Sequence, residues 1–163
     1  MALQTPIKKV GYIKGVGDKI PESLESIGIA VEKLDIEKLQ LEELQKLSTV
    51  IIGIRAFNVL PSLKTKNKLL WEYVFQGGSL IIQYNTTRGL QTKAITPYPL
   101  SLSRDRVTDQ TAKVTLLNPN HPILNFPHKI TENDFEGWIL AVSYTHLRAH
   151  ETKANLVCRL LLE

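Results

Sequence analysis

TVIIGIRAFN, residues 49–58, is the stretch that decides the fold of this chain. Apolar residues, mostly β-branched, run from Thr49 to Ile54 and end abruptly at Arg55. A companion stretch, SLIIQYNT at residues 79–86, has the same form. This pattern is typical of a strand that is buried on both faces of a parallel sheet. The polar residues that follow each run predict where the strand emerges at the carboxyl edge, which is the ligand-binding edge of open α/β sheets.

Strands and helices are expected to alternate around these two stretches. Further strands are predicted over residues 7–13 and 29–34, and amphipathic helices over 20–27, 36–47 and 63–75. Glycines at positions 77 and 78 are suited to end the last of these helices. The resulting order, βαβαβαβ with short links, predicts a parallel sheet with helices on both of its faces.

The regular pattern stops after the fourth strand. Residues 85–102 have no sustained period and predict a long loop, with Arg55–Asn58 forming an earlier one. A further strand is expected over residues 112–117, a tight turn over 118–122 and a short helical segment from Ile123. Thr131 and Asp134 have the spacing of a capping box. We expect residues 98 to about 140 to fold over the carboxyl edge.

Composition limits the classes of partner. The 163 residues are enough for one domain, and 43% of them are hydrophobic. The net charge of +4 is mild and the lysines are scattered, so we expect no nucleic-acid partner. No apolar run approaches the roughly 20 residues that span a bilayer, and the first residues lack the apolar core of a signal peptide. We therefore expect no membrane partner.

The last residues do not continue the pattern of the rest. VSYTHLRAHET at 142–152 and NLVCRLLLE at 155–163 together resemble a translated sequencing adaptor, read in one frame. We therefore predict a natural domain over 1–141, incomplete at its carboxyl end, and a non-native tail over 142–163 that adds no native packing. His146, His150 and Cys158 fall in that tail and are not taken as metal ligands or nucleophiles.

Several familiar kinds of chemistry lack their residues. Residues 1–141 contain no cysteine and no G-x-S-x-G serine turn, so a thiol or serine nucleophile of the usual kind is not expected. Gly15 and Gly17 follow the first strand, but a dinucleotide-binding GxGxxG loop needs glycine where Ile20 stands. We interpret this segment as a plain turn between strand and helix.

What remains is a group of polar residues at the predicted carboxyl edge. Arg55 and Asn58 end the third strand, Tyr84 and Asn85 end the fourth, and Arg104, Asp105, Arg106 and Asp109 lie in the segment beyond. In a functional interpretation, arginine and asparagine bind a sugar or carboxylate, and Tyr84 stacks on a ring. In a structural one, the arginines and aspartates beyond residue 103 pair and fasten the segment to the sheet. Both interpretations stay open for Arg55 and Asn58. His121 and His128 are predicted to be turn residues.

Six phrases carry a resemblance to a known family. They are VGYIKGVGDKIPESLESIG (10–28), VIIGIRAFN (50–58), GGSLIIQYNT (77–86), YPLSLSRDRVTD (98–109), NPNHPILNFP (118–127) and ITENDFEGW (130–138). Together they resemble the carboxyl-terminal, class I glutamine amidotransferase-like domain of large bacterial PIG-L (LmbE-like) deacetylases. The resemblance implies an α/β fold of flavodoxin- or amidotransferase-like kind, truncated at its carboxyl end.

The resemblance also implies which parts of such a protein would lie elsewhere. The family's amino-terminal domain is a zinc-dependent hydrolase acting on N-acetylglucosamine groups, with histidine, proline and two aspartates in its metal motif. Here His121-Pro122 is followed by Ile123 and Leu124, so no zinc ligand carries over and no cofactor is expected in this chain. The implied partner is the deacetylase domain, and family members are typically exported to the periplasm.

Two functions follow from this. The first is a non-catalytic accessory domain that binds carbohydrate or packs against the deacetylase. The alternative is a stand-alone small-molecule enzyme of the trehalose-utilisation-like (ThuA-like) group. The resemblance implies that this group shares the same fold. The second would need a nucleophile, a metal triad or a convergent pair of acids, and the sequence offers none. We therefore favour the first and expect no catalytic activity in this chain.

Overall fold

The computed structural model describes residues 9–102, 114–116, 118–137, 147–149 and 161–162. The chain divides into two compact units, residues 1–97 and residues 98–163. The first unit contains the sheet and the helices around it, and the second contains short strands and helical turns. Among the described residues, no helix is long and apolar enough to cross a membrane.

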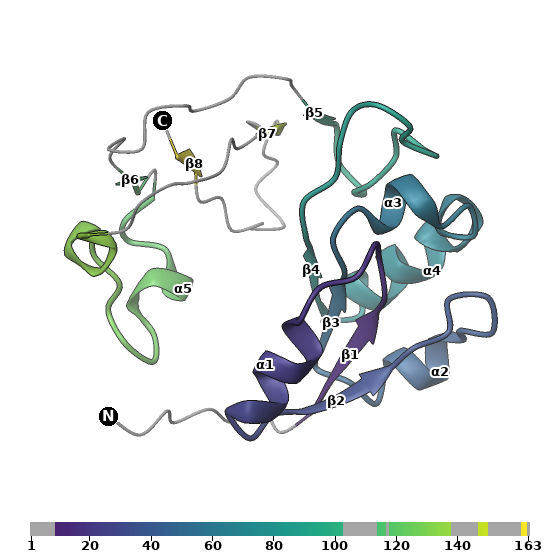
Figure 1. Cartoon of the computed structure of the whole chain (residues 1–163), viewed down its shortest axis with the longest axis horizontal. Helices are drawn as coiled ribbons and strands as arrows, with labels where there is room; N and C mark the ends of the chain where they lie inside the picture. The colour runs from purple at the N-terminus through teal and green to yellow at the C-terminus, as the bar shows by residue number, and fades with distance from the viewer. Residues whose placement is uncertain (1–8, 103–113, 117, 138–146, 150–160, 163) are drawn as a thin grey trace. The chain divides into compact units, whose positions relative to one another are not determined.

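The first unit is built on a four-stranded parallel sheet. Its strands are β1 (Lys9–Ile13), β2 (Ala30–Lys33), β3 (Thr49–Ile52) and β4 (Ser79–Ile82), in the order β2-β1-β3-β4 (Figure 1). In the register, Tyr12 lies beside Ile51, and Ile52 lies beside Ile82. This order is that of the first four strands of a flavodoxin-like sheet. The predicted α/β fold with a parallel sheet is therefore confirmed.

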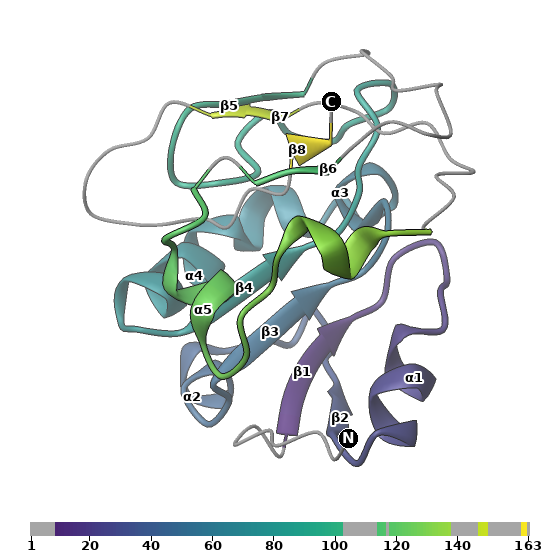
Figure 2. The ribbon, with the colours of Figure 1, turned by 90° about the vertical axis from the view of Figure 1, so that its left-hand side faces the viewer.

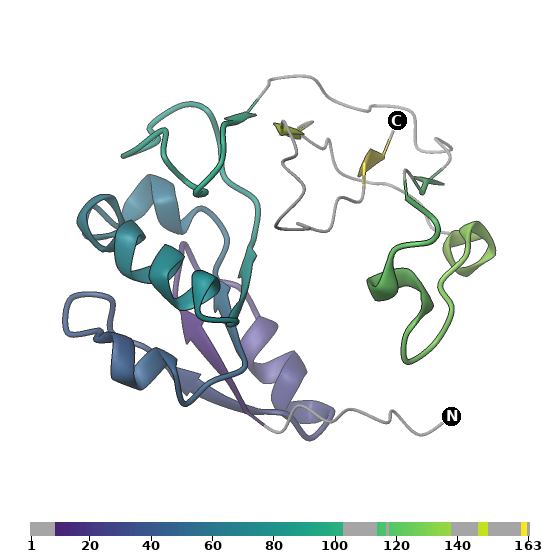
Figure 3. The same ribbon diagram turned by 180° about the vertical axis from the view of Figure 1, so that it is seen from behind.

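Helices cover both faces of this sheet. Helix α1 (Ile20–Ser26) lies on one face, and α2 (Leu41–Leu44) and α4 (Leu63–Phe75) lie on the other (Figure 2). The view from behind separates the same two layers (Figure 3). Right-handed crossovers require this arrangement, because the chain moves outward from β1 to β2 and then back across β1 to β3. The predicted bounds of α4 are confirmed, and Gly77, which follows the helix, has φ +99°.

Each face of the sheet has its own apolar layer. Beneath α1, the buried side chains of Val10, Tyr12, Ile29 and Ile51 pack together. Ile20 and Leu24 of the helix pack against them. Ile13, Val50 and Ile52 alternate along their strands with the strand residues of this cluster and so face the opposite layer, where α2 and α4 lie. The helix residues Leu44, Leu63 and Leu70 are also fully buried. All four residues of β3 are buried, as predicted for the central strand.

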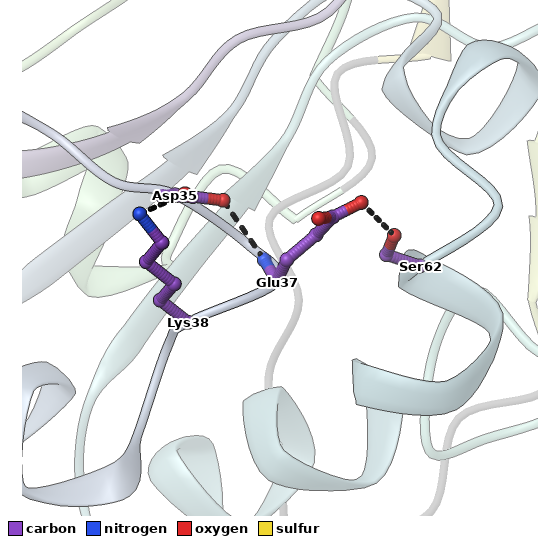
Figure 4. A network of polar contacts seen from close by, with 4 residues as sticks. All are labelled: Asp35, Glu37, Lys38 and Ser62. Carbon is purple, nitrogen blue, oxygen red and sulfur yellow. Dashed lines mark hydrogen bonds and ion pairs between the residues drawn. The ribbon is translucent and has the colours of Figure 1, made fainter.

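One predicted helix is much shorter than its apolar periodicity indicated. The stretch 36–47 was predicted to be helical throughout, but only α2 within it is a helix. The Asp35 carboxylate accepts a hydrogen bond from the Glu37 amide and pairs with Lys38, which closes a turn, and Glu37 accepts from Ser62 (Figure 4). Gln40 is then extended and begins α2 with a capping box. The helix prediction was wrong because Leu39 is buried from a loop rather than from a helix face.

Two further predictions in the first unit need correction. The predicted loop after β3 contains a helical turn, α3 (Ala56–Val59). Strand β4 was predicted to be buried on both faces, but Ile81 is 50% exposed. Ile81 is exposed because β4 is the last strand of the sheet in the described residues. Helix α1, which could cover that face, lies over the strands at the other side.

The second unit contains only short elements. Strand β5 (Leu100–Leu102) pairs antiparallel with β7 (Leu147–Ala149), and β6 (Val114–Thr115) pairs antiparallel with β8 (Leu161–Leu162). Helix α5 (Pro122–Asn125) confirms the predicted helical segment, and a 3-10 turn (Glu132–Phe135) begins with the predicted capping box of Thr131 and Asp134. Two short parts of segment 142–163 thus pair with strands. That segment 142–163 adds no native packing stays a prediction. The folding of residues 98–140 over the sheet edge also stays one.

Candidate functional site

Three loops meet at the carboxyl edge of the sheet, and we call them the edge loops. They are residues 14–18 after β1, 53–58 after β3 and 83–91 after β4 (Figure 1). Because neighbouring parallel strands end at the same edge, these loops are brought together by the strand order alone. Specific side chains then fasten each loop to the next.

Asp18 fastens the first edge loop to the second. Its carboxylate accepts hydrogen bonds from the Tyr12 hydroxyl at 2.7 Å, from the Ile20 amide at 3.0 Å and from the Ile54 amide at 3.3 Å. The amide of Val16 also donates to the Ile54 carbonyl at 2.9 Å. Sequence reasoning did not single out Asp18, although an aspartate two residues before the first helical amide is a known turn-forming pattern.

The Asp18 carboxylate changes the electrostatics of this corner. Burial raises the pKa of the Tyr12 phenol above its ordinary value, and the hydrogen bond to Asp18 and its negative charge raise it further. The carboxylate also occupies the Ile20 amide, so the start of α1 is closed to an anionic ligand and any such ligand would have to bind elsewhere on the edge loops. A side chain at Gly15 would put its Cβ 2.0 Å from the Ile54 carbonyl oxygen. Gly15 is thus needed for close approach of two backbones.

Asn58 and Asn85 fasten the second edge loop to the third, and we call them the asparagine clamp. Asn85 Oδ1 accepts from the Phe57 amide at 3.1 Å, and its Nδ2 donates to the Gln83 carbonyl at 2.8 Å. Asn58 Oδ1 accepts from the Thr86 amide at 3.0 Å, and its Nδ2 donates to the carbonyls of Thr86 at 2.9 Å and Arg88 at 3.2 Å. Each asparagine therefore holds the loop to which the other belongs.

The clamp decides what these two candidate residues do in the fold. Both asparagines are buried, and both carbonyl oxygens already accept a hydrogen bond from a backbone amide. A buried amide that is paired with backbone in this way stabilises the fold, because leaving those backbone groups unpaired would cost about 1–3 kcal/mol each. The contacts of Asn58 and Asn85 therefore describe a structural role, which is to hold the edge loops together.

Arg55 and Tyr84, the other two candidates within the edge loops, have exposed side chains. Tyr84 is 46% exposed as a residue, and Arg55 is exposed as well. Their backbones are joined, since the Arg55 amide donates to the Tyr84 carbonyl at 2.7 Å. Arg55 has φ +57° and ψ 21°, which makes it the one residue other than glycine with positive φ among the described residues.

The amides of this turn are all engaged. Besides Arg55, the Ala56 amide donates to Gly53, the Phe57 amide to Asn85 and the Asn58 amide to Arg55. A strained strand-to-helix turn can display a nucleophile and supply free amides to an oxyanion. Here the residue displayed is an arginine, and no amide of residues 55–58 is left to bind a substrate oxygen. A ligand at this turn would therefore have to be bound by side chains rather than by backbone amides.

Gln83, at the end of β4, has an unpaired acceptor. Its side-chain oxygen Oε1 is buried and accepts no hydrogen bond among the described residues. A buried polar atom without a partner costs about 1–3 kcal/mol. The edge loops therefore hold one acceptor with hydrogen-bonding capacity to spare.

The remaining sequence candidates are placed as follows. Arg104, Asp105, Arg106 and Asp109 lie outside the described residues, so both interpretations of them stand as predictions. His121 is a turn residue as predicted, because it precedes α5 and its Nδ1 accepts from the Ile123 amide at 3.2 Å. Within the part of the chain that the structure describes, no three histidine, cysteine, aspartate or glutamate residues gather as a metal site.

Comparisons with known proteins identify no relative. No protein-family model matches the chain. No curated protein and no solved structure matches it either.

Proposed function

We propose that this chain is a non-catalytic accessory domain of a PIG-L-type N-acetylglucosaminyl deacetylase and that its edge loops bind carbohydrate. The observation that supports this most directly is the turn after β3. It presents an exposed arginine in a strained conformation, while every amide of the turn is already hydrogen-bonded.

The lack of a catalytic group at this turn favours binding over catalysis. Acyl transfer at a strand-to-helix turn needs a nucleophile on the turn and free amides for the oxyanion. The turn carries Arg55 where a nucleophile would stand. The Phe57 amide, which could otherwise bind the oxyanion, donates to Asn85 of the asparagine clamp. An accessory domain needs neither.

The exposed groups beside the turn fit a sugar. Tyr84 presents a half-exposed ring next to Arg55, and the two residues share a backbone hydrogen bond. Binding sites for small polar molecules typically combine an aromatic surface with a few polar groups that fix orientation. A sugar ring can lie on the phenol while its substituents bond to the guanidinium.

Calorimetric titration of the full chain with N-acetylglucosamine oligosaccharides and with their acidic counterparts tests the proposal. We expect binding to at least one of these sugars and a loss of about tenfold in affinity, or about 1.4 kcal/mol, for Tyr84→Ala. Phe75→Ala is the matched control, because Phe75 is also an exposed aromatic residue, at 63% more exposed than Tyr84, and lies at the far end of α4.

Three results would count against the proposal. Absence of binding to every sugar tested would remove the carbohydrate role. Release of acetate or another product from a small substrate by the purified chain would instead favour the ThuA-like enzyme. Equal losses for Tyr84→Ala and Phe75→Ala would show that the edge loops are not the binding site.

A further inference from the structure

We propose that the edge loops recognise an anionic group, a carboxylate or a phosphate, on the sugar that they bind. This inference rests on the proposed carbohydrate function and specifies its ligand class. It comes from three exposed cations, Lys14, Arg55 and Arg88, one on each edge loop.

Backbone contacts bring these three residues to one place. Lys14 precedes Gly15, which packs against the Ile54 carbonyl, and Arg55 is the next residue along. The carbonyl of Arg88 accepts from Asn58 Nδ2 at 3.2 Å, and the Asn58 amide donates to the Arg55 carbonyl at 2.9 Å. The three cations are thus carried on backbone segments that are directly bonded or packed together.

The positive charge of this cluster is not neutralised within the edge loops. Their only carboxylate is that of Asp18, which sets one negative charge against three positive ones and bonds to the Tyr12 hydroxyl and two backbone amides rather than to any of the three cations. The ion pairs of the described residues lie elsewhere, between Lys9 and Glu32 and between Lys38 and Asp35. Lys14, Arg55 and Arg88 therefore keep their charge available to a ligand in the described part of the chain.

Two neutral polar side chains of the site are not free to bind a ligand. The amides of Asn58 and Asn85, which would suit the hydroxyls of a neutral sugar, are buried and committed to backbone. The exposed side chains left are mainly cationic. A guanidinium presents paired donors in a plane, which match the two oxygens of a carboxylate or phosphate.

Titration of the full chain with four compounds tests this inference. They are glucuronate, glucose 6-phosphate, N-acetylglucosamine and inorganic phosphate, each followed by heat or by amide chemical shifts at low ionic strength. We expect one or both acidic sugars to bind at least about tenfold more tightly than N-acetylglucosamine, since hydrogen bonds to charged groups are worth more than neutral ones. Raising the salt concentration should weaken this binding.

Charge-matched variants locate the site. Arg55→Gln should weaken binding of the acidic sugar about tenfold, and Lys14→Gln or Arg88→Gln should each weaken it severalfold. Lys46→Gln is the control, because Lys46 is an exposed cation near the start of β3, at the opposite edge of the sheet. It should leave the affinity unchanged.

The outcomes separate this inference from the proposed function. Tighter binding of N-acetylglucosamine than of either acidic sugar would overturn the anionic preference and leave the carbohydrate role standing. Equal binding of inorganic phosphate and glucose 6-phosphate would show that the sugar contributes nothing, which overturns the inference. Binding of none of the four would overturn the inference, and the oligosaccharide titration would then decide the proposed function on its own. Comparing the affinities for glucuronate and for glucose 6-phosphate identifies which anion the edge loops prefer.

Discussion

Replacing Arg55 by glycine should stabilise the fold and weaken ligand binding at the same time. Arg55 has φ +57°, and a residue with a side chain costs about 1–2 kcal/mol in the left-handed region. Glycine removes that cost but gains freedom in the unfolded chain worth about 0.5–1 kcal/mol. The bonds from the Arg55 amide to Tyr84 and from the Asn58 amide to Arg55 are backbone bonds and are kept. The net gain in the free energy of unfolding should be about 0.5–1 kcal/mol.

Urea denaturation followed by circular dichroism measures this gain. For a chain of this length, each 1 kcal/mol corresponds to a rise in Tm of about 2–4 °C, so a thermal scan should agree. Arg55→Ala is the control, since alanine also removes the guanidinium but keeps the strain of positive φ. It should lose binding as Arg55→Gly does and should gain no stability.

Three results would contradict the reasoning about Arg55. If Arg55→Gly unfolded at or below the urea concentration of the unmodified chain, the left-handed conformation would carry no strain. If Arg55→Ala gained as much stability as Arg55→Gly, the gain would come from removing a surface charge. Unchanged binding in both variants would remove Arg55 from the proposed site.

Three further perturbations have expected outcomes. Gly15→Ala should lower the free energy of unfolding by about 1–3 kcal/mol, because its Cβ would lie 2.0 Å from the Ile54 carbonyl oxygen. Asn85→Ala should lower it by about 1–3 kcal/mol, because the Phe57 amide would lose its acceptor. Raising the pH above the ordinary tyrosine pKa of 10.0 should also destabilise the fold. The unfolded chain then releases the Tyr12 proton while the folded chain, whose Tyr12 pKa is raised, keeps it, so stability present below that pH is lost above it.

Each of these expectations has its own control. Lys19 is an exposed residue of the same turn, so Lys19→Ala should leave the free energy of unfolding nearly unchanged, and a loss equal to that of Gly15→Ala would argue against the contact with Ile54. Asn133 is exposed, so Asn133→Ala should leave the unfolding midpoint unchanged, and a loss equal to that of Asn85→Ala would argue against the clamp. A Tyr12→Phe variant that lost as much stability in alkali would show that other groups cause the pH dependence.

The parts of the fold that were predictable are those with strong local signals. The β-branched run at residues 49–54 identified β3 as central, and its four strand residues are all buried. Helix α4 is bounded by Pro61 and Gly77, and its bounds match the prediction. Residues 36–47 have leucines at helical spacing too, but Gln40 is extended and Leu39 is buried from a loop. Spacing alone does not distinguish those two cases.

The candidate site was predictable in its place but not in its contacts. The ends of two strands identified Arg55, Asn58, Tyr84 and Asn85, because parallel strands end at one edge. Which side chains face solvent depends on pairings between loops about 28 residues apart in sequence, as between Asn58 and Thr86. Such pairings leave no periodic signal. The same holds for Asp18, whose bond to the Ile54 amide spans 36 residues.

The asparagine clamp makes the carboxyl edge a preformed surface. The second and third edge loops are held to each other by side-chain bonds at both Asn58 and Asn85, and Asp18 holds the first. A ligand that meets such a surface does not have to order the backbone, so little conformational entropy is lost on association. Binding should then follow a single kinetic phase whose rate rises linearly with ligand concentration, with no slow step that saturates.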